Sequence, residues 1–134
     1  MDKSNEFFVP EIGVDVVDVE RMQFALERTP RIRQRLFTEA EIAYCEKFRF
    51  AERHYAGRWA AKEAVTKALG CGLIQWNGVE VMRQPRRAPT VRIFGKIKKF
   101  ADYVGVRQEE ISISITHSEL SAVAVATIRR KDPS

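Results

Sequence analysis

The sequence predicts an α+β fold: a single small domain in which a mostly antiparallel sheet is packed by helices, including one long central helix. Helix-forming residues dominate the stretch 52–69, which supplies the central helix. Runs of alternating apolar residues on its C-terminal side supply strands. The 134 residues contain no internal repeat and no low-complexity linker, so we expect one domain over 1–134, with frayed ends at 1–6 and 130–134.

The first predicted strand carries the first candidate functional residue. β-Branched and nearly uncharged residues after Pro10 predict a buried strand that ends at Asp18, which suits the N-cap of a short helix over 19–27. Asp15 lies within this strand, where a carboxylate is costly unless it is paired or binds a cation. Asp15 therefore needs a partner from elsewhere in the chain.

Two further helix starts follow the short helix. Thr29 and Pro30 have the pattern of an N-cap followed by proline at the first helical position. The segment from Thr38 to Glu41 has the pattern of a capping box, so we expect a helix from there through Phe48.

The central helix is expected to end at Leu69, because Gly70 stands where a left-handed cap residue belongs. After it we expect a β-hairpin with a basic loop, an amphipathic helix that ends at Gly105, and two strands around a tight turn that holds His117. These elements are expected over residues 79–83, 90–94, 95–103, 111–116 and 120–126.

Charge and cysteine content narrow the function classes. A net charge of +5 indicates an anionic partner, for which nucleic acid, a phosphorylated cofactor and an acidic protein all remain open. No apolar run has the length of a membrane span, and the N-terminal residues are unlike a signal peptide. Cys45 and Cys71 indicate reduced thiols in a cytosolic protein, since their spacing suits neither a disulfide framework nor a zinc site.

Polar residues from separate elements form a candidate site. Trp59, Glu63 and Lys67 lie four residues apart along one face of the central helix. The simple alternatives are a surface ion pair between Glu63 and Lys67 and a structural role for His117 in the core. With Asp15, however, Glu63 can hold a hard cation such as Mg²⁺. Lys67 and His117 can then meet phosphate oxygens.

Three motifs run from Ile12 to Asp15, from Gly57 to Gly70 and from Ile113 to Ser118. In this order they resemble the motifs of the holo-acyl-carrier-protein synthases, which are the short, bacterial-type 4′-phosphopantetheinyl transferases. The resemblance covers nearly the whole chain, from about Ile12 to Ile128, and the helix motif is the most specific part of it.

The resemblance implies an enzyme that moves the 4′-phosphopantetheine arm of coenzyme A onto a serine of apo-acyl carrier protein. Adenosine 3′,5′-bisphosphate is released, and the implied setting is fatty acid biosynthesis in the cytoplasm. Asp15 and Glu63 match the positions that bind Mg²⁺, and the implied base for the serine proton is Glu63, directly or through a metal-bound water. Lys67 matches a lysine beside the pyrophosphate, while Arg58 and His117 match coenzyme A contacts.

The hairpin loop departs from the family pattern at one position. The family carries Gly-x-Pro, whereas this loop reads Arg87, Ala88 and Pro89, so the backbone at position 88 lacks the freedom of glycine. Pro89 and the neighbouring arginines still suit a pocket for the adenine and 3′-phosphate of coenzyme A.

A basic stretch near the N-terminus is similar to the family surface that docks the acidic helix of acyl carrier protein. The matching residues are four arginines with two apolar residues between them: Arg21, Ala25, Arg28, Arg31, Ile32 and Arg35. Their shared charge suits the steering of an acidic partner. The resemblance also implies a homotrimer with active sites between protomers, for which the strands near the C-terminus are candidate interfaces.

Two other function classes are weighed on the residues themselves. A nucleic-acid-binding module would combine the arginines with stacking aromatics, but neither Trp59 nor Trp76 lies in the arginine cluster of the sequence. A catalytically inactive trimeric scaffold would have little use for a buried, unpaired Asp15. We therefore expect an enzyme with neither a nucleic-acid nor a membrane partner.

Overall fold

The computed structural model describes residues 8–72 and 78–130. Trp76 and nearly all of the expected frayed ends lie outside these residues. Arg130 is the exception, and it is held in place, because its guanidinium donates a 2.6 Å hydrogen bond to the carbonyl of Val104. No helix in the described part of the chain has the length and apolar character needed to cross a membrane.

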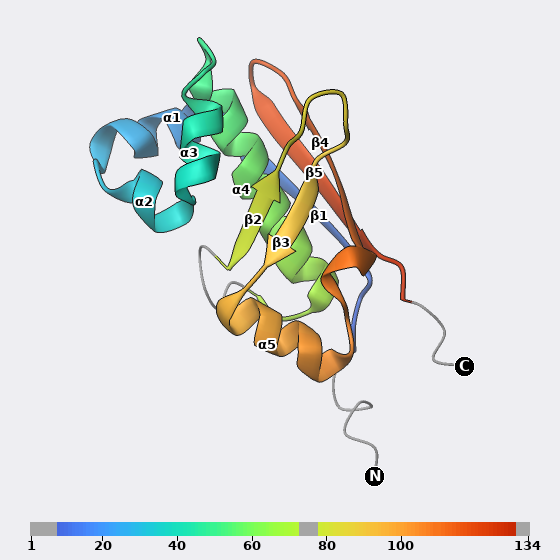
Figure 1. Cartoon of the computed structure of the whole chain (residues 1–134). Coiled ribbons are helices and arrows are strands. Elements are labelled where there is room, and N and C mark those ends of the chain that lie inside the picture. Colours follow the sequence, from blue (N-terminus) through green and yellow to red (C-terminus); the bar gives the residue numbers. More distant parts are fainter. Residues whose placement is uncertain (1–7, 73–77, 131–134) are drawn as a thin grey trace.

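Two antiparallel sheets form the β part of the fold (Figure 1). The larger sheet contains β1 (Ile12–Asp18), β5 (Ser121–Ile128) and β4 (Ile111–His117), paired in that order. The smaller sheet is the hairpin of β2 (Val79–Met82) and β3 (Thr90–Ile93). The α+β class with antiparallel sheets is confirmed.

The long central helix is α4 (Ala51–Leu69), which lies between the two sheets (Figure 1). It ends as predicted at Gly70, whose φ of 86° is left-handed. Fully buried Ala64 and Ala68 let the three-stranded sheet approach the helix closely. A second helix, α5 (Gly95–Val104), ends at the left-handed Gly105 and is followed by a short 3₁₀ turn.

The remaining helices, α1 (Val19–Arg28), α2 (Ile32–Leu36) and α3 (Glu39–Cys45), gather on one side of α4 (Figure 1). Asp18 caps α1 by accepting a 3.1 Å hydrogen bond from the backbone of residue 21, as predicted. The capping box at residues 38–41 is also confirmed. These helices share a hydrophobic cluster with the N-terminal half of α4.

The predicted helix start at Thr29 is wrong. The backbone N–H of Thr29 donates to the carbonyl of Ala25 and so ends α1, while the carbonyl of Thr29 accepts from Ile32. Residues 29–31 therefore form a turn, and α2 begins at Ile32 without a side-chain cap.

Two other predicted boundaries shift by a few residues. The helix expected through Phe48 ends at Cys45, because the backbone N–H groups of Lys47 and Phe48 reach back only three residues. His117 is not in the turn but is the last residue of β4, where it pairs with Ala122 of β5. The ladder therefore fixes the backbone of His117.

Candidate active site

Strand β1 passes so close to α4 that only glycine fits at position 13. A Cβ atom on Gly13 would lie 2.0 Å from the carbonyl oxygen of Ala64 and 2.8 Å from the amide nitrogen of Ala68. Side chains alternate along a strand, so Asp15 lies on the same face of β1 as Gly13. The close approach at Gly13 thus brings the carboxylate of Asp15 against α4.

Asp15 meets Lys67 and Glu63 of α4 at this point. The Lys67 ammonium lies 3.0 Å from Asp15 Oδ1 and donates a second hydrogen bond of 3.1 Å to the carbonyl of Val14. The ion pair therefore joins α4 to β1 and is not the alternative pair within the helix between Glu63 and Lys67. Asp15 is thus paired, and the prediction of an unpaired Asp15, which spoke against an inactive scaffold, is wrong.

The two carboxyl groups of this cluster influence each other. Burial, together with a hydrogen bond to Asp15 and its negative charge, raises the pKa of Glu63 to about 7, while Lys67 and a hydrogen bond from Trp59 oppose the shift. Asp15 Oδ2 is buried and receives no hydrogen bond from the described residues. Lys67 compensates Asp15 through Oδ1, and the buried Oδ2 beside the Glu63 carboxyl group is the atom that could share a proton or bind a cation.

The donor set at this cluster is small. The described residues contain no group of three or more His, Cys, Asp and Glu side chains arranged to hold a metal ion. Asp15 and Glu63 alone fit a hard cation that completes its coordination with water and substrate oxygens, which is how Mg²⁺ commonly binds.

A groove of about 460 Å³ lies beside the cluster, between α1, α2 and α4. It is apolar at its base and carries two arginines, with the lining residues Val17, Arg21, Met22, Ala25, Ile32, Arg35, Leu36 and Trp59. Trp59 contributes one wall and precedes Glu63 by one turn of α4, so the groove opens next to the carboxylates.

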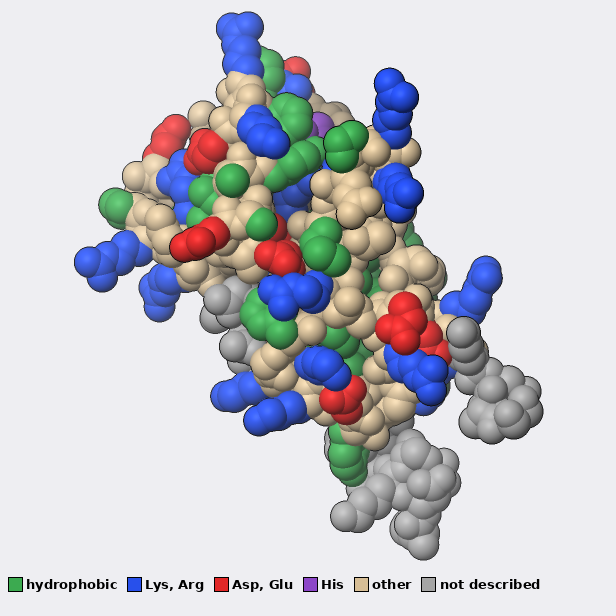
Figure 2. Space-filling view, in the orientation of Figure 1, with side chains coloured by type: hydrophobic (Ala, Val, Ile, Leu, Met, Phe, Trp, Pro, Cys, Tyr) green, Lys and Arg blue, Asp and Glu red, His purple; other side chains and the backbone are tan. Residues whose placement is uncertain are grey.

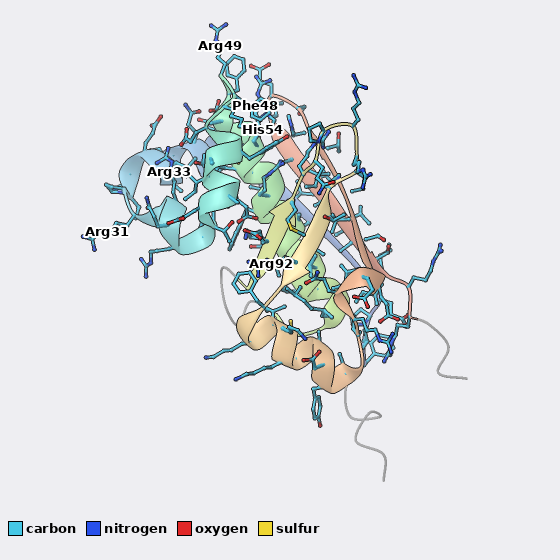
Figure 3. The ribbon with its side chains drawn as sticks, viewed as in Figure 1. Arg31, Arg33, Phe48, Arg49, His54 and Arg92 are labelled. Atoms are coloured by element: carbon cyan, nitrogen blue, oxygen red, sulfur yellow. The ribbon has the colours of Figure 1, made fainter. Side chains whose placement is uncertain are left out.

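The arginines of the basic stretch divide into two sets. Arg21 and Arg35 line the groove together with Ala25 and Ile32. Arg28 instead stacks on the exposed ring of Phe24, and its guanidinium carbon lies 5.0 Å from the ring centre. Arg31 projects outward from the end of the molecule that holds α1 and α2 (Figure 3). Lys and Arg side chains project around much of the outline of the molecule (Figure 2).

A second cavity, of about 250 Å³, lies at the N-terminal end of α4. We call it the anion pocket, and its lining residues are Tyr44, Phe48, His54, Arg58, Arg83, Ile115 and His117. Arg58 is buried with its guanidinium 4.1 Å above the ring of Tyr44. His54 stacks on Phe48 at 3.7 Å and meets His117 at 4.8 Å, and Figure 3 shows Phe48 and His54 together at this end of the helix.

Electrostatics in the anion pocket favour a negatively charged ligand. Burial first, and then the nearby His117, Arg58 and Arg83, lower the pKa of His54 to about 4. Burial and the charge of Arg58 also lower the pKa of His117. Both imidazoles are therefore neutral at pH 7, and an anion would relieve the crowding of positive charge that holds their pKa values down.

The hairpin loop at residues 83–89 contributes one residue to the anion pocket. That residue is Arg83, whereas Pro89 is not among the lining side chains. The positive φ of the loop, 64°, belongs to Arg86. Ala88 therefore needs no left-handed conformation, and the loss of the family glycine costs no backbone strain at that position.

Comparison with known proteins decides the family. Residues 11–124 match the sequence profile of the 4′-phosphopantetheinyl transferase superfamily. The chain belongs to this family. The transferase is 38% identical over 120 residues to the holo-[acyl-carrier-protein] synthase of Moorella thermoacetica, with 88% of this chain and 92% of that protein covered. It is 41% identical over 116 residues to the synthase of Beutenbergia cavernae, covering 86% and 95%.

Solved structures agree with this assignment. The transferase superposes on Helicobacter pylori holo-[acyl-carrier-protein] synthase in complex with coenzyme A with a TM-score of 0.75 and 27% identity, over 88% of this chain and 99% of the other. For the Bacillus anthracis enzyme in complex with coenzyme A (3′,5′-ADP), the TM-score is 0.70 and the identity 26%, over 89% and 95%. The predicted resemblance, fold class and enzyme class are confirmed.

The transferase contains functional candidates that sequence reasoning missed. Trp59 is distant from the arginine cluster in the sequence, but in the structure it lines the groove together with Arg21 and Arg35. His54 and Arg83 line the anion pocket. A signal for His54 was present, since it precedes Arg58 by four residues and thus shares its helix face. No local pattern marks Arg83, because its place depends on the fold of the hairpin.

Proposed function

We propose that this chain transfers the 4′-phosphopantetheine arm of coenzyme A to a serine of apo-acyl carrier protein, in a Mg²⁺-dependent reaction that leaves adenosine 3′,5′-bisphosphate. The observation that carries the proposal is the cluster of Asp15, Glu63 and Lys67 beside two cavities of suitable chemistry. Arg58 and Trp59 are consecutive in α4, yet one lines the anion pocket and the other lines the groove. A phosphorylated substrate and a protein substrate can therefore meet at the same helix.

The reacting groups follow from the chemistry of phosphoryl transfer. The serine oxygen of the carrier forms a bond to the phosphorus next to pantetheine, and the bond from that phosphorus to the bridging oxygen breaks. Glu63, directly or through a metal-bound water, accepts the serine proton, since its carboxyl group follows Trp59 of the groove by one turn of α4. Lys67 neutralises charge on the departing phosphate.

Asp15 and Glu63 are the residues that would hold Mg²⁺. The free buried oxygen of Asp15 supports this assignment. Bound there, Mg²⁺ would polarise the phosphoryl group and stabilise the leaving phosphate. Arg58 and His117 would bind phosphates of coenzyme A in the anion pocket. Pro89 of the hairpin loop, which does not line that pocket, would contact the nucleotide end.

The groove suits an acidic helix of the carrier. An apolar base with arginines at its edge matches an amphipathic helix that carries acidic residues. Arg21, Ala25, Ile32 and Arg35 would form the contact, and Arg28 and Arg31 would add positive charge around it.

We further propose that the chain is a single domain, works in fatty acid biosynthesis in the cytoplasm, and assembles as a homotrimer with active sites between protomers. One face of the larger sheet supports the assembly. Ile12, Val14 and Val16 of β1 are 59%, 48% and 62% exposed, and Val123 and Val125 of β5 continue this apolar face. A second copy of the chain would cover it.

The test is the intact mass of an apo-acyl carrier protein after incubation with this chain, coenzyme A and Mg²⁺. We expect a gain equal to one phosphopantetheine, which disappears with EDTA and with Asp15→Asn. Asp18→Asn serves as a matched control, because Asp18 caps α1 and does not face α4. A folded protein that modifies none of several apo carriers would refute the proposal.

A further inference from the structure

A second ion pair, between Lys62 and Glu41, is buried where α4 packs against its neighbouring elements. Lys62 precedes Glu63 in the sequence but lies on a different side of the helix. Lys62 and Glu41 are both fully buried, and the Lys62 ammonium lies 2.7 Å from Glu41 Oε1. Lys62 follows Arg58 by four residues, so both project from the helix face that bears the anion pocket. The proposed reaction gives neither member of the pair a role.

The pair joins three elements through hydrogen bonds to backbone. Lys62 donates from α4 to the carbonyl of Val79 in β2. Glu41 of α3 accepts from the backbone N–H of Val81 in β2 at 2.8 Å and from the N–H of Thr38 at 2.9 Å. The ammonium and the carboxylate thus provide hydrogen-bond partners for the backbone groups along the edge of β2 that faces away from β3.

A second link strengthens the same junction. Thr38 Oγ1 donates a 2.6 Å hydrogen bond to Glu80 of β2, and Glu80 in turn lies 3.0 Å from Arg92 of β3. Figure 3 shows Arg92 on the hairpin. The hairpin is therefore attached to α3 and α4 through the backbone edge of β2 and through the side chain of Glu80.

Each element that the pair joins also lines the anion pocket. α3 leads from Glu41 to Tyr44, β2 leads from Val81 to Arg83, and α4 carries Arg58 one turn before Lys62. The positions of Tyr44, Arg58 and Arg83 relative to one another therefore depend on the junction that Lys62 and Glu41 form.

Stability alone explains this pair poorly. Burying two charges costs much of what their attraction returns, and apolar replacements of buried pairs are often as stable. A hydrogen-bonded pair does, however, fix the register of the elements that it joins. We propose that Lys62 and Glu41 are positioning residues that hold the hairpin and α3 on α4, and thereby set the affinity of the anion pocket for the phosphate-bearing end of coenzyme A. The identity of that ligand rests on the proposed function.

The test compares a single variant and an uncharged double variant with a core control. Lys62→Met alone leaves the Glu41 carboxylate buried without its cation, so this variant is expected to unfold easily. Lys62→Met with Glu41→Gln removes both charges and keeps an amide oxygen for the Val81 N–H. Val65→Ala is the control, because Val65 is fully buried in α4 and its truncation lowers stability without removing a charge or a hydrogen bond of the junction.

Calorimetry measures the binding of adenosine 3′,5′-bisphosphate, and steady-state kinetics measure kcat and the KM values of both substrates. For the double variant we expect about tenfold weaker nucleotide binding and a matching rise in the KM for coenzyme A, with unchanged kcat and carrier KM. Val65→Ala should lower the melting temperature and leave the nucleotide affinity at the wild-type value.

Equal nucleotide affinity of the double variant and the wild type would overturn the inference and leave the proposed function standing. A wild-type protein that neither binds the nucleotide nor modifies a carrier would overturn both.

Discussion

Replacing Gly13 by alanine should separate β1 from α4 and disable the enzyme. The added Cβ would lie 2.0 Å from the carbonyl oxygen of Ala64, whereas ordinary Cβ contacts begin at 3.4 Å. The opposing atoms belong to the backbone of α4, so no side chain can move aside to make room. The strand and the helix must then move apart by about 1 Å or more, a misplacement of the size that strongly impairs catalysis.

Both stability and activity should respond. Overpacking of a core costs about 1–3 kcal/mol, and we expect Gly13→Ala to reach the upper end because the clash involves main chain. Transfer should fall by about 100-fold, since Asp15 moves away from Glu63 and Lys67 with its strand. Urea unfolding measures the first effect, and the mass assay on apo carrier measures the second.

Gly57→Ala is the matched control for this prediction. Its Cβ would meet only the Cγ2 atom of Ile115, at 3.0 Å, and the end of a side chain can give way. Alanine is also favoured over glycine inside a helix by about 1 kcal/mol, so near-normal stability is expected. A Gly13→Ala protein with wild-type stability and transfer rate would refute the role assigned to the close contact.

The groove, the histidines and the ion pair each offer a further measurement. Arg21→Glu should raise the KM for carrier about tenfold at unchanged coenzyme A KM, and Arg28→Glu should raise it less, because only Arg21 lines the groove; equal losses for both substrates would contradict this. Burial holds the pKa of His54 near 4 in the folded protein against 6.5 for the free group. The folded state thus binds fewer protons, and the free energy of unfolding should fall by about 1–2 kcal/mol, after solvent screening, as pH drops from about 6.5 to 4. His54→Phe should weaken the dependence of the unfolding free energy on pH, measured by urea titrations at several pH values. An unchanged dependence would show that another group causes it. Lys67→Met should lower kcat about 100-fold in steady-state assays, since the cation beside Asp15 is lost; a normal kcat would exclude Lys67 from the reaction.

Features encoded within a single element were predictable from the sequence. The capping box at residues 38–41, the left-handed cap at Gly70 and the course of α4 each depend on a few adjacent residues, and the structure confirms all three. The start of α2 was missed because Thr29 ends the preceding helix and does not begin the next one. A threonine is found in either role, so its presence does not distinguish them.

Features that depend on contacts between elements were harder to predict. Lys67 pairs with Asp15, 52 positions away, because the glycine at position 13 lets the two backbones approach. Trp59 enters the arginine groove because α1 and α2 fold back over α4. The spacing of residues within a helix cannot reveal either contact, since both partners lie in other elements.

The ion pair between Lys67 and Asp15 has a consequence for the order in which the site is loaded. Its ammonium already compensates the carboxylate that a divalent cation would seek, so Mg²⁺ alone gains little by entering. A pyrophosphate changes this balance, because it attracts Lys67 and brings oxygens of its own to the metal. We therefore expect synergistic loading, in which Mg²⁺ binds measurably tighter in calorimetry once coenzyme A is present. Without coenzyme A, the Lys67 ammonium would thus keep Mg²⁺ binding to the site weak.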